Sequence, residues 1–183
     1  ANVAGGAPTT ETINIGTDGI GSGDQIGAIS LTATDRITLR GDIETSNEAN
    51  TTDVTFTGPV RIEGTVTIDT DAAALDGAIE FTSTLDSLSA GSGNLTILAG
   101  DTGADAGGGL TFGGTIGGTA ALGTLNINAS DSTVAFTLPQ IGDGTGTKGA
   151  AATTIGNANS ELITLSGSGV AVEYNFTDNV TFN

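Results

Sequence analysis

Apolar residues recur at every second position in many short runs of this chain, and this periodicity most limits the folds it can adopt. Thr, Ser or Asn fills the positions between them, so each run has one apolar face and one polar face. Gly, Asp, Asn and Ser separate the runs and favour turns. The sequence therefore predicts an all-β protein with half-buried strands at 12–15, 29–31, 37–39, 65–68, 95–97, 125–127 and 163–165.

An internal repeat connects several of these runs. Its pattern, apolar-x-Phe-x-Gly-x-apolar, is complete at 54–60 and 110–116. Ser replaces Gly in 79–85, one residue is inserted in 134–141, and Leu replaces Phe in 37–43. The repeat positions follow one another at irregular intervals, at Leu39, Phe56, Phe81, Phe112 and Phe136. A second element, apolar-x-Ile, follows the Phe residues and ends at Ile68, Ile97 and Ile127.

The repeat predicts a coil of short strands that cannot bury its apolar face alone. Stacked coils bury a continuous core, with like residues aligned in ladders. We therefore expect a right-handed parallel β-helix in which residues 1–183 form one module, since its turns accept insertions at little cost. The alternative is a tandem pair of immunoglobulin-like β-sandwiches. In the β-helix, the expected internal ladder is Leu39, Phe56, Phe81, Phe112, Phe136 and Phe182.

Composition excludes several classes of function. The chain has 21 Asp and Glu against 4 Lys and Arg, so it cannot form the basic surface that a nucleic-acid partner requires. It has no Cys and no His, which excludes thiol catalysis, zinc fingers and Ser-His-Asp chemistry. No apolar run is long enough to span a membrane. We expect no catalysis, because the few cations should offset neighbouring carboxylates rather than hold a sugar acid: Arg36, Arg40, Arg61 and Lys148.

Calcium is the one cofactor that the sequence suggests. Asp18, Asp24, Asp101 and Asp105 lie in Gly/Asp-rich segments, where carboxylates and backbone carbonyls could supply the oxygen ligands that Ca²⁺ prefers. None of these segments matches an EF-hand or the Gly-Gly-x-Gly-x-Asp β-roll repeat. Gly-Asp pairs also form ordinary turns, so a solvated turn is the competing interpretation.

The two ends of the sequence together complete one repeat. Val180-Thr181-Phe182-Asn183 matches the first half of the Phe motif, and with Ala1 placed after Asn183, Val3 stands where the motif has its last apolar residue. We therefore expect head-to-tail packing of the chain with its own copies, either as separate subunits or as units of one long polypeptide. The predicted contact residues are Val180, Phe182 and Asn183 at one end and Ala1, Val3, Ile13 and Ile15 at the other.

The segment 94–129 resembles the repeats of giant bacterial surface proteins of the filamentous-haemagglutinin-like, β-strand-repeat type. It contains Asn94-Leu95-Thr96-Ile97, Gly109-Leu110-Thr111-Phe112-Gly113-Gly114 and Leu125-Asn126-Ile127-Asn128. The resemblance implies a secreted or cell-surface β-helix used in adhesion, fibres or matrix. We expect a self-associating building block of an extracellular filament, and the alternative is a monomeric adhesin that binds a glycan or a receptor.

Overall fold

The structure, a computed structural model, describes residues 2–4, 12–21, 26–45, 53–71, 76–99, 108–129, 135–144, 148–156, 162–165, 174 and 180–182. Every named element in this part of the chain is a β-strand, and every strand pair is parallel. The prediction of an all-β parallel β-helix is confirmed. The sandwich alternative is wrong, because immunoglobulin-like sheets are antiparallel.

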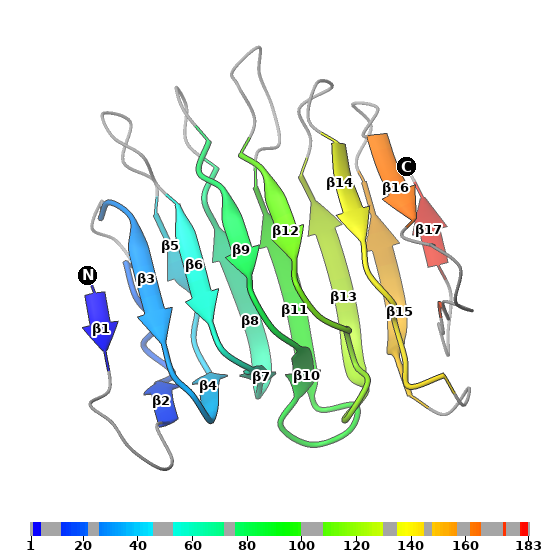
Figure 1. Ribbon diagram of the computed structural model, residues 1–183, viewed down its shortest axis with the longest axis horizontal. Coiled ribbons are helices and arrows are strands. Elements are labelled where there is room, and N and C mark those ends of the chain that lie inside the picture. The colour runs from blue at the N-terminus through cyan, green and yellow to red at the C-terminus, as the bar shows by residue number, and fades with distance from the viewer. Residues whose placement is uncertain are drawn as a thin grey trace.

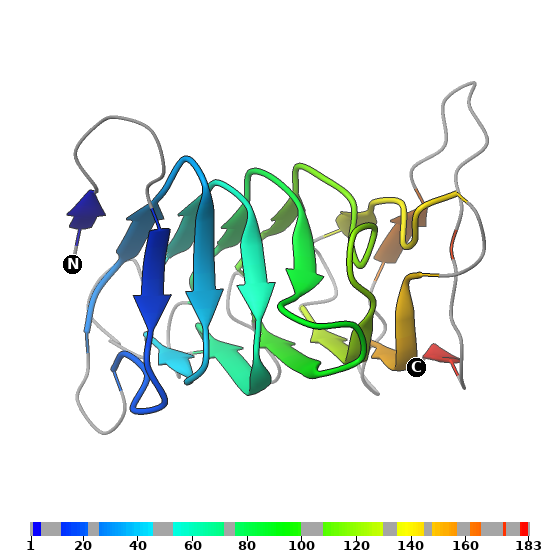
Figure 2. The same ribbon diagram turned by 90° about the horizontal axis from the view of Figure 1, so that it is seen from below.

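The strands form three walls of a solenoid (Figures 1 and 2). The first wall contains β1 (Asn2–Ala4), β3 (Ile29–Thr32), β6 (Val54–Thr57), β9 (Ile79–Phe81) and β12 (Leu110–Phe112), and beyond β12 come β14 (Ala135–Leu138) and β16 (Leu162–Leu165). The second contains β2 (Thr12–Ile15), β4 (Arg36–Leu39), β7 (Val60–Ile62) and β10 (Leu85–Ser87), and single bridges at Ile116, Ile141 and Tyr174 extend it. The third contains β5 (Ile43–Glu44), β8 (Gly64–Asp69), β11 (Gly93–Leu98), β13 (Leu122–Asn128), β15 (Ala150–Ile155) and β17 (Val180–Phe182), with Ile20 bridged to Ile43.

The solenoid is right-handed. In Figure 1 the chain descends along the near first wall and ascends along the far third wall while it advances from the N-terminal to the C-terminal end. This is the handedness that parallel crossover connections almost always adopt. Six strands and one bridged residue cross the third wall in the described part of the chain, which corresponds to seven coils there.

The core is a set of inward-facing columns that run along the solenoid axis. Phe56, Phe81 and Phe112 pair in register, and their rings stack with centroids 4.9 and 5.4 Å apart and interplanar angles of 13° and 5°. Phe56 and Phe81 are completely buried. Such offset stacking contributes about 0.5–1.5 kcal/mol per pair beyond the burial of apolar area.

The predicted ladder needs one correction at its N-terminal side. Leu39 lies in the second wall, where it pairs with Ile15 and Ile62, and the residue in register with Phe56 is Leu31. The sequence separation between Leu31 and Phe56 equals that between Phe56 and Phe81. The short motif around Leu39 resembles the Phe motif because each wall contains apolar-x-apolar triplets.

The ladder beyond Phe112 is described only by its backbone. Phe136 pairs with Ile163 in β14 and β16, and its side chain lies outside the described part. Phe182 pairs with Ile155 in the third wall, so its assignment to the Phe motif of the first wall is wrong. The sequence separation between Ile155 and Phe182 is nearly the same as that between Ile127 and Ile155, the preceding pair of the third wall.

The corner between the first and second walls depends on glycine at one position. Gly58 has a φ of 125°, and a Cβ built on it would lie 1.9 Å from the carbonyl oxygen of Ala33 in the preceding coil. The close approach exists because the Ala33 N–H donates to the Thr57 carbonyl at 2.9 Å. A side chain at residue 58 would therefore separate two coils at this corner.

We predict that Phe81→Ala lowers the free energy of unfolding by about 3–5 kcal/mol, because it removes the central ring of the stack and leaves a cavity. Urea denaturation followed by circular dichroism measures the change. The matched control is Thr111→Ala, an exposed position in the neighbouring strand, which should change stability by less than about 0.5 kcal/mol. Equal losses in the two variants would contradict the proposed importance of the stack.

Candidate self-association surfaces

The N-terminal end of the solenoid presents strand edges. Of the residues that the structure describes, none pairs with the outer side of β1, β2 or the bridge residue Ile20. Arg40 donates its N–H to the Ile15 carbonyl at 3.1 Å, so the backbone groups of Ile13 and Ile15 face β4. Since successive residues of a parallel strand point to opposite sides, the backbone groups of Thr12 and Asn14 face away from the solenoid.

The apolar columns lose part of their cover at this end. Ile13 and Ile15 are 9% exposed, whereas their partners one coil further on, Ile37 and Leu39, are fully buried. Ile20 is half-buried and packs against the core. A further coil placed on this end would therefore bury apolar surface as well as pair the strand edge.

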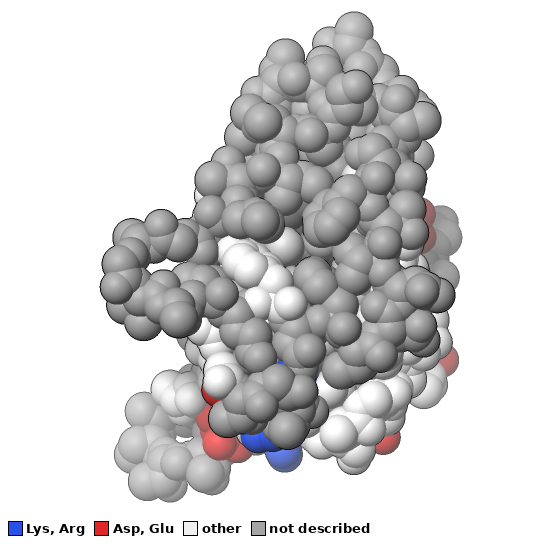
Figure 3. Space-filling model, turned by 90° about the vertical axis from the view of Figure 1, so that its right-hand side faces the viewer, with Lys and Arg blue, Asp and Glu red and all other residues white. Residues whose placement is uncertain are grey.

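The C-terminal end carries β16, Tyr174 and β17. Tyr174 is half-buried, bridges to Ile141 and donates its hydroxyl to the Leu138 carbonyl at 3.0 Å. In the described part of the chain, no strand pairs with the outer side of β16 or β17. In Figure 3, which looks onto this end, the described Lys, Arg, Asp and Glu that are visible lie toward the lower and right-hand edges.

The residues predicted for self-association lie at the two ends but in different walls. Val3 is in the first wall, Ile13 and Ile15 are in the second, and Val180 and Phe182 are in the third. The expected pairing of the segment ending in Phe182 with Val3 or Ile13 therefore joins strands of different walls and needs correction. Ala1 and Asn183 lie outside the described residues.

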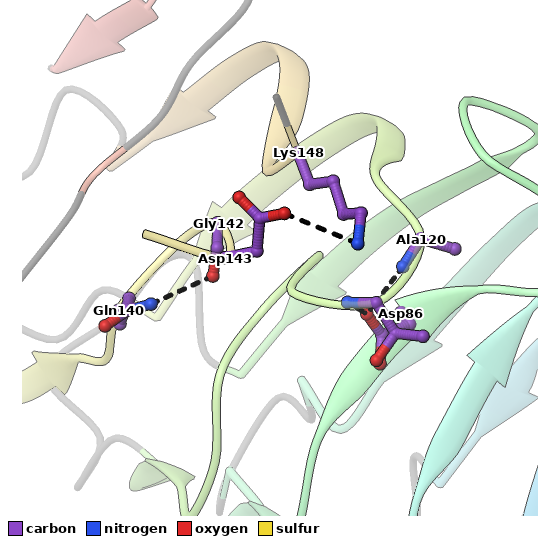
Figure 4. A network of polar contacts seen from close by, with 7 residues as sticks. Asp86, Ala120, Gln140, Gly142, Asp143 and Lys148 are labelled. Atoms are coloured by element: carbon purple, nitrogen blue, oxygen red, sulfur yellow. Dashed lines mark hydrogen bonds and ion pairs between the residues drawn. The ribbon is translucent and has the colours of Figure 1, made fainter. Parts of the chain in front are cut away.

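A buried carboxylate that the sequence analysis missed connects its own coil to the coils before and after it. Asp86 is completely buried in β10, and its Oδ2 lies 2.7 Å from the Arg61 guanidinium of β7. Its Oδ1 accepts the backbone N–H groups of Thr119 and Ala120 at 2.7 and 3.1 Å (Figure 4). Arg61 and Asp86 are in register, so the number of residues per coil could have predicted that they are neighbours. Nothing in the Leu-Asp-Ser sequence indicates that the Asp is buried.

Two of the other three cations, Arg40 and Lys148, also pair with carboxylates, whereas the buried Nε of Arg36 has no hydrogen-bond partner among the described residues. Arg40 pairs with Glu63 one coil further on, and Lys148 pairs with Asp143 at 3.3 Å (Figure 4). Both pairs are more exposed than Arg61–Asp86. These contacts neutralise acids between or within coils, in a protein with a net charge of −17.

Of the four Asp residues predicted to bind calcium, the structure describes one. Asp18 is exposed in the turn that precedes Gly19. Asp24, Asp101 and Asp105 lie outside the described residues. Within the described ranges, there is no group of three or more acidic side chains placed to hold a metal ion.

A shallow, uncharged groove runs over the outer face of the third wall. Its volume is about 270 Å³, and Thr96, Asn126 and Thr154 line it as a column in register. Leu98 and Ile127 add apolar surface to the groove. Hydroxyl and amide groups at successive coils are therefore about 4.8 Å apart along the axis.

Comparison with protein-family models, with curated proteins and with solved structures found no match. Among the residues that the structure describes, there is no helix of the length and hydropathy needed to cross a membrane.

We predict that Asp86→Ala destabilises the fold by about 3–5 kcal/mol, because it leaves the Arg61 charge and two backbone N–H groups without their acceptor. Asp86→Asn should cost less, since its Oδ1 can still accept those N–H groups. Arg40→Gln is the control, and it should cost about 1 kcal/mol or less because the Arg40–Glu63 pair is partly exposed. Urea denaturation ranks the three variants, and an Asp86→Ala loss no larger than that of Arg40→Gln would refute this connecting role.

Proposed function

We propose that this protein is a structural building block that stacks end to end into a filament. The observation that carries the proposal is the presence of strand edges at both ends of one parallel solenoid. An open edge pairs readily with another strand, and main-chain hydrogen bonds supply the affinity of such β-augmentation. The incompletely covered Ile13, Ile15 and Ile20 add an apolar component.

The geometry of the ends favours an open polymer over a closed dimer. All coils run in the same direction, so the N-terminal end of one copy fits the C-terminal end of another in the same parallel pattern. A contact between two different surfaces of one molecule is heterologous, and along a straight axis it does not close. Head-to-tail stacking therefore extends the solenoid along its own axis.

Charge should confine association to the ends. A net charge of −17 repels copies that meet side to side. It also opposes stacking at low ionic strength, and salt screens this repulsion. We therefore expect filaments to form more readily at about 0.5 M than at about 0.01 M salt, where the Debye length is about 30 Å.

An extracellular or cell-surface location is part of the proposal. Its support is the resemblance of 94–129 to the repeats of giant bacterial surface proteins, in which β-helices serve adhesion and fibres. The neighbouring unit in the filament is then either a separate chain or a further module of the same polypeptide. Pairing through strand edges is the same in both cases.

A second candidate function is that of a monomeric adhesin that binds a neutral glycan. The observation that favours it is the uncharged groove with Thr96, Asn126 and Thr154 in register, because hydroxyl and amide groups can donate to and accept from sugar hydroxyls. A glycan array probed with the parent chain and with Asn126→Ala tests it. Specific binding by a monomeric parent that the variant loses would favour this candidate.

We predict that Asn14→Pro blocks filament growth and leaves the monomer folded. Proline removes the outward N–H of residue 14 and places its ring where the next strand would pair, while the bonds of Ile13 and Ile15 to β4 remain. Asn14→Ala is the matched control, since it loses the same side chain and keeps the N–H. The protein concentration needed for assembly should rise at least about tenfold in Asn14→Pro only, corresponding to about 1.4 kcal/mol.

Sedimentation velocity over a range of protein concentrations, with negative-stain electron microscopy, measures assembly of the three chains. Circular dichroism on heating checks that both variants retain the fold. A parent chain that stays monomeric at every concentration and salt would refute stacking. Equal assembly of Asn14→Pro and Asn14→Ala would refute the role of the β2 edge.

A further inference from the structure

Two columns of paired residues, one in the second wall and one in the third, run from end to end of the described structure. In the third wall, each residue pairs with the next along the column Ile20, Ile43, Ile68, Ile97, Ile127, Ile155 and Phe182. In the second wall the column is Ile13, Ile37, Val60, Leu85, Ile116, Ile141 and Tyr174. Both columns begin with isoleucine and end with an aromatic residue.

In the third-wall column, the backbone N–H and C=O groups of each residue point toward the C-terminal end of the solenoid. Ile20 donates its N–H to the Asp42 carbonyl at 2.8 Å and accepts from the Glu44 N–H at 2.9 Å, so both its groups point toward the next coil. The Gly156 N–H donates to the Ile127 carbonyl of the preceding coil. The backbone groups of Ile155, one residue earlier, therefore point toward the following coil, as those of Ile20 do. Phe182 is in register with Ile155, so its backbone groups point out of the C-terminal end.

We propose that stacked copies join in the register that carries these columns across the joint. Phe182 of one copy then lies on Ile20 of the next, Tyr174 lies on Ile13, and β16 lies beside β1. This inference rests on the proposed stacking and adds its register. It differs from the joint expected from sequence alone, in which Phe182 and Val3 belong to one repeat.

The local backbone around Ile20 makes this register specific. Gly19 and Gly21 have φ values of 68° and 88°, and a Cβ on either would come within 2.2 Å or 2.0 Å of a carbonyl oxygen in the next coil. Ile20 is therefore the one side chain that the segment 19–21 offers to the column. A slip by one residue would place glycine opposite Phe182 and lose this apolar contact.

The second wall supports the same register. When Tyr174 lies on Ile13, the outward N–H of Asn14, one residue beyond Ile13, faces the C-terminal end of the neighbouring copy. The Arg40 N–H faces the Ile15 carbonyl in the same way within the solenoid. The pairing that Asn14→Pro would remove is thus part of the same ladder. Two walls with one common register fix the rotation of one copy relative to the next about the axis.

Engineered cysteines test the register directly, because the chain has none of its own. Neighbours in a parallel ladder have Cα atoms about 4.8 Å apart, within the range of a disulfide. The test variant carries Ile20→Cys and Phe182→Cys, and the comparison variant carries Val3→Cys and Phe182→Cys. Filaments are grown under reducing conditions, oxidised mildly and run on a non-reducing gel.

We expect a ladder of covalent multimers from the Ile20/Phe182 variant and at most dimers from the Val3/Phe182 variant. A second variant, Ile13→Cys with Tyr174→Cys, should give the same ladder and serves if the first variant does not fold. Filaments that crosslink through Val3/Phe182, or through neither of the predicted pairs, would overturn the register and leave stacking intact. Absence of filaments from the unmutated chain would overturn stacking itself.

Discussion

The parallel backbone ladder between successive coils is the interaction on which the rest of this structure depends. A single coil of two or three short strands has no partner for its own N–H and C=O groups, and it satisfies them only on the coils before and after it. The ladder also sets the spacing at which side chains meet. Phe56, Phe81 and Phe112 stack because their backbones are held in register, and the same register places Arg61 beside Asp86.

The same constraint connects the fold to the proposed function. Interior coils are paired on both sides, but the first and last coils each leave one side of their strands facing outward in the described structure. A β-helix solves this problem with a cap or with a neighbour. The high negative charge acts in the same direction, because it disfavours lateral contacts and leaves the ends as the surfaces where association gains most.

Much of the fold could be predicted from the sequence, because alternation of apolar residues reports which face of a strand is buried. The Phe motif likewise identified the stacked residues Phe56, Phe81 and Phe112. Wall assignment was harder, since apolar-x-apolar triplets occur in every wall, and so Leu39 and Phe182 were placed in the wrong one. Asp86 was not predictable, because its burial depends on a cation and two N–H groups from other coils.

The axial rise of the assembled filament tests the central claim most directly, and cryo electron microscopy of the chain in moderate salt measures it. Seven coils at about 4.8 Å each predict one chain per axial rise of about 34 Å, with a strong layer line at about 4.8 Å. A repeat of twice that rise would indicate copies alternating in direction and would contradict head-to-tail stacking. Isolated particles at every concentration would contradict the account of this protein as a filament unit.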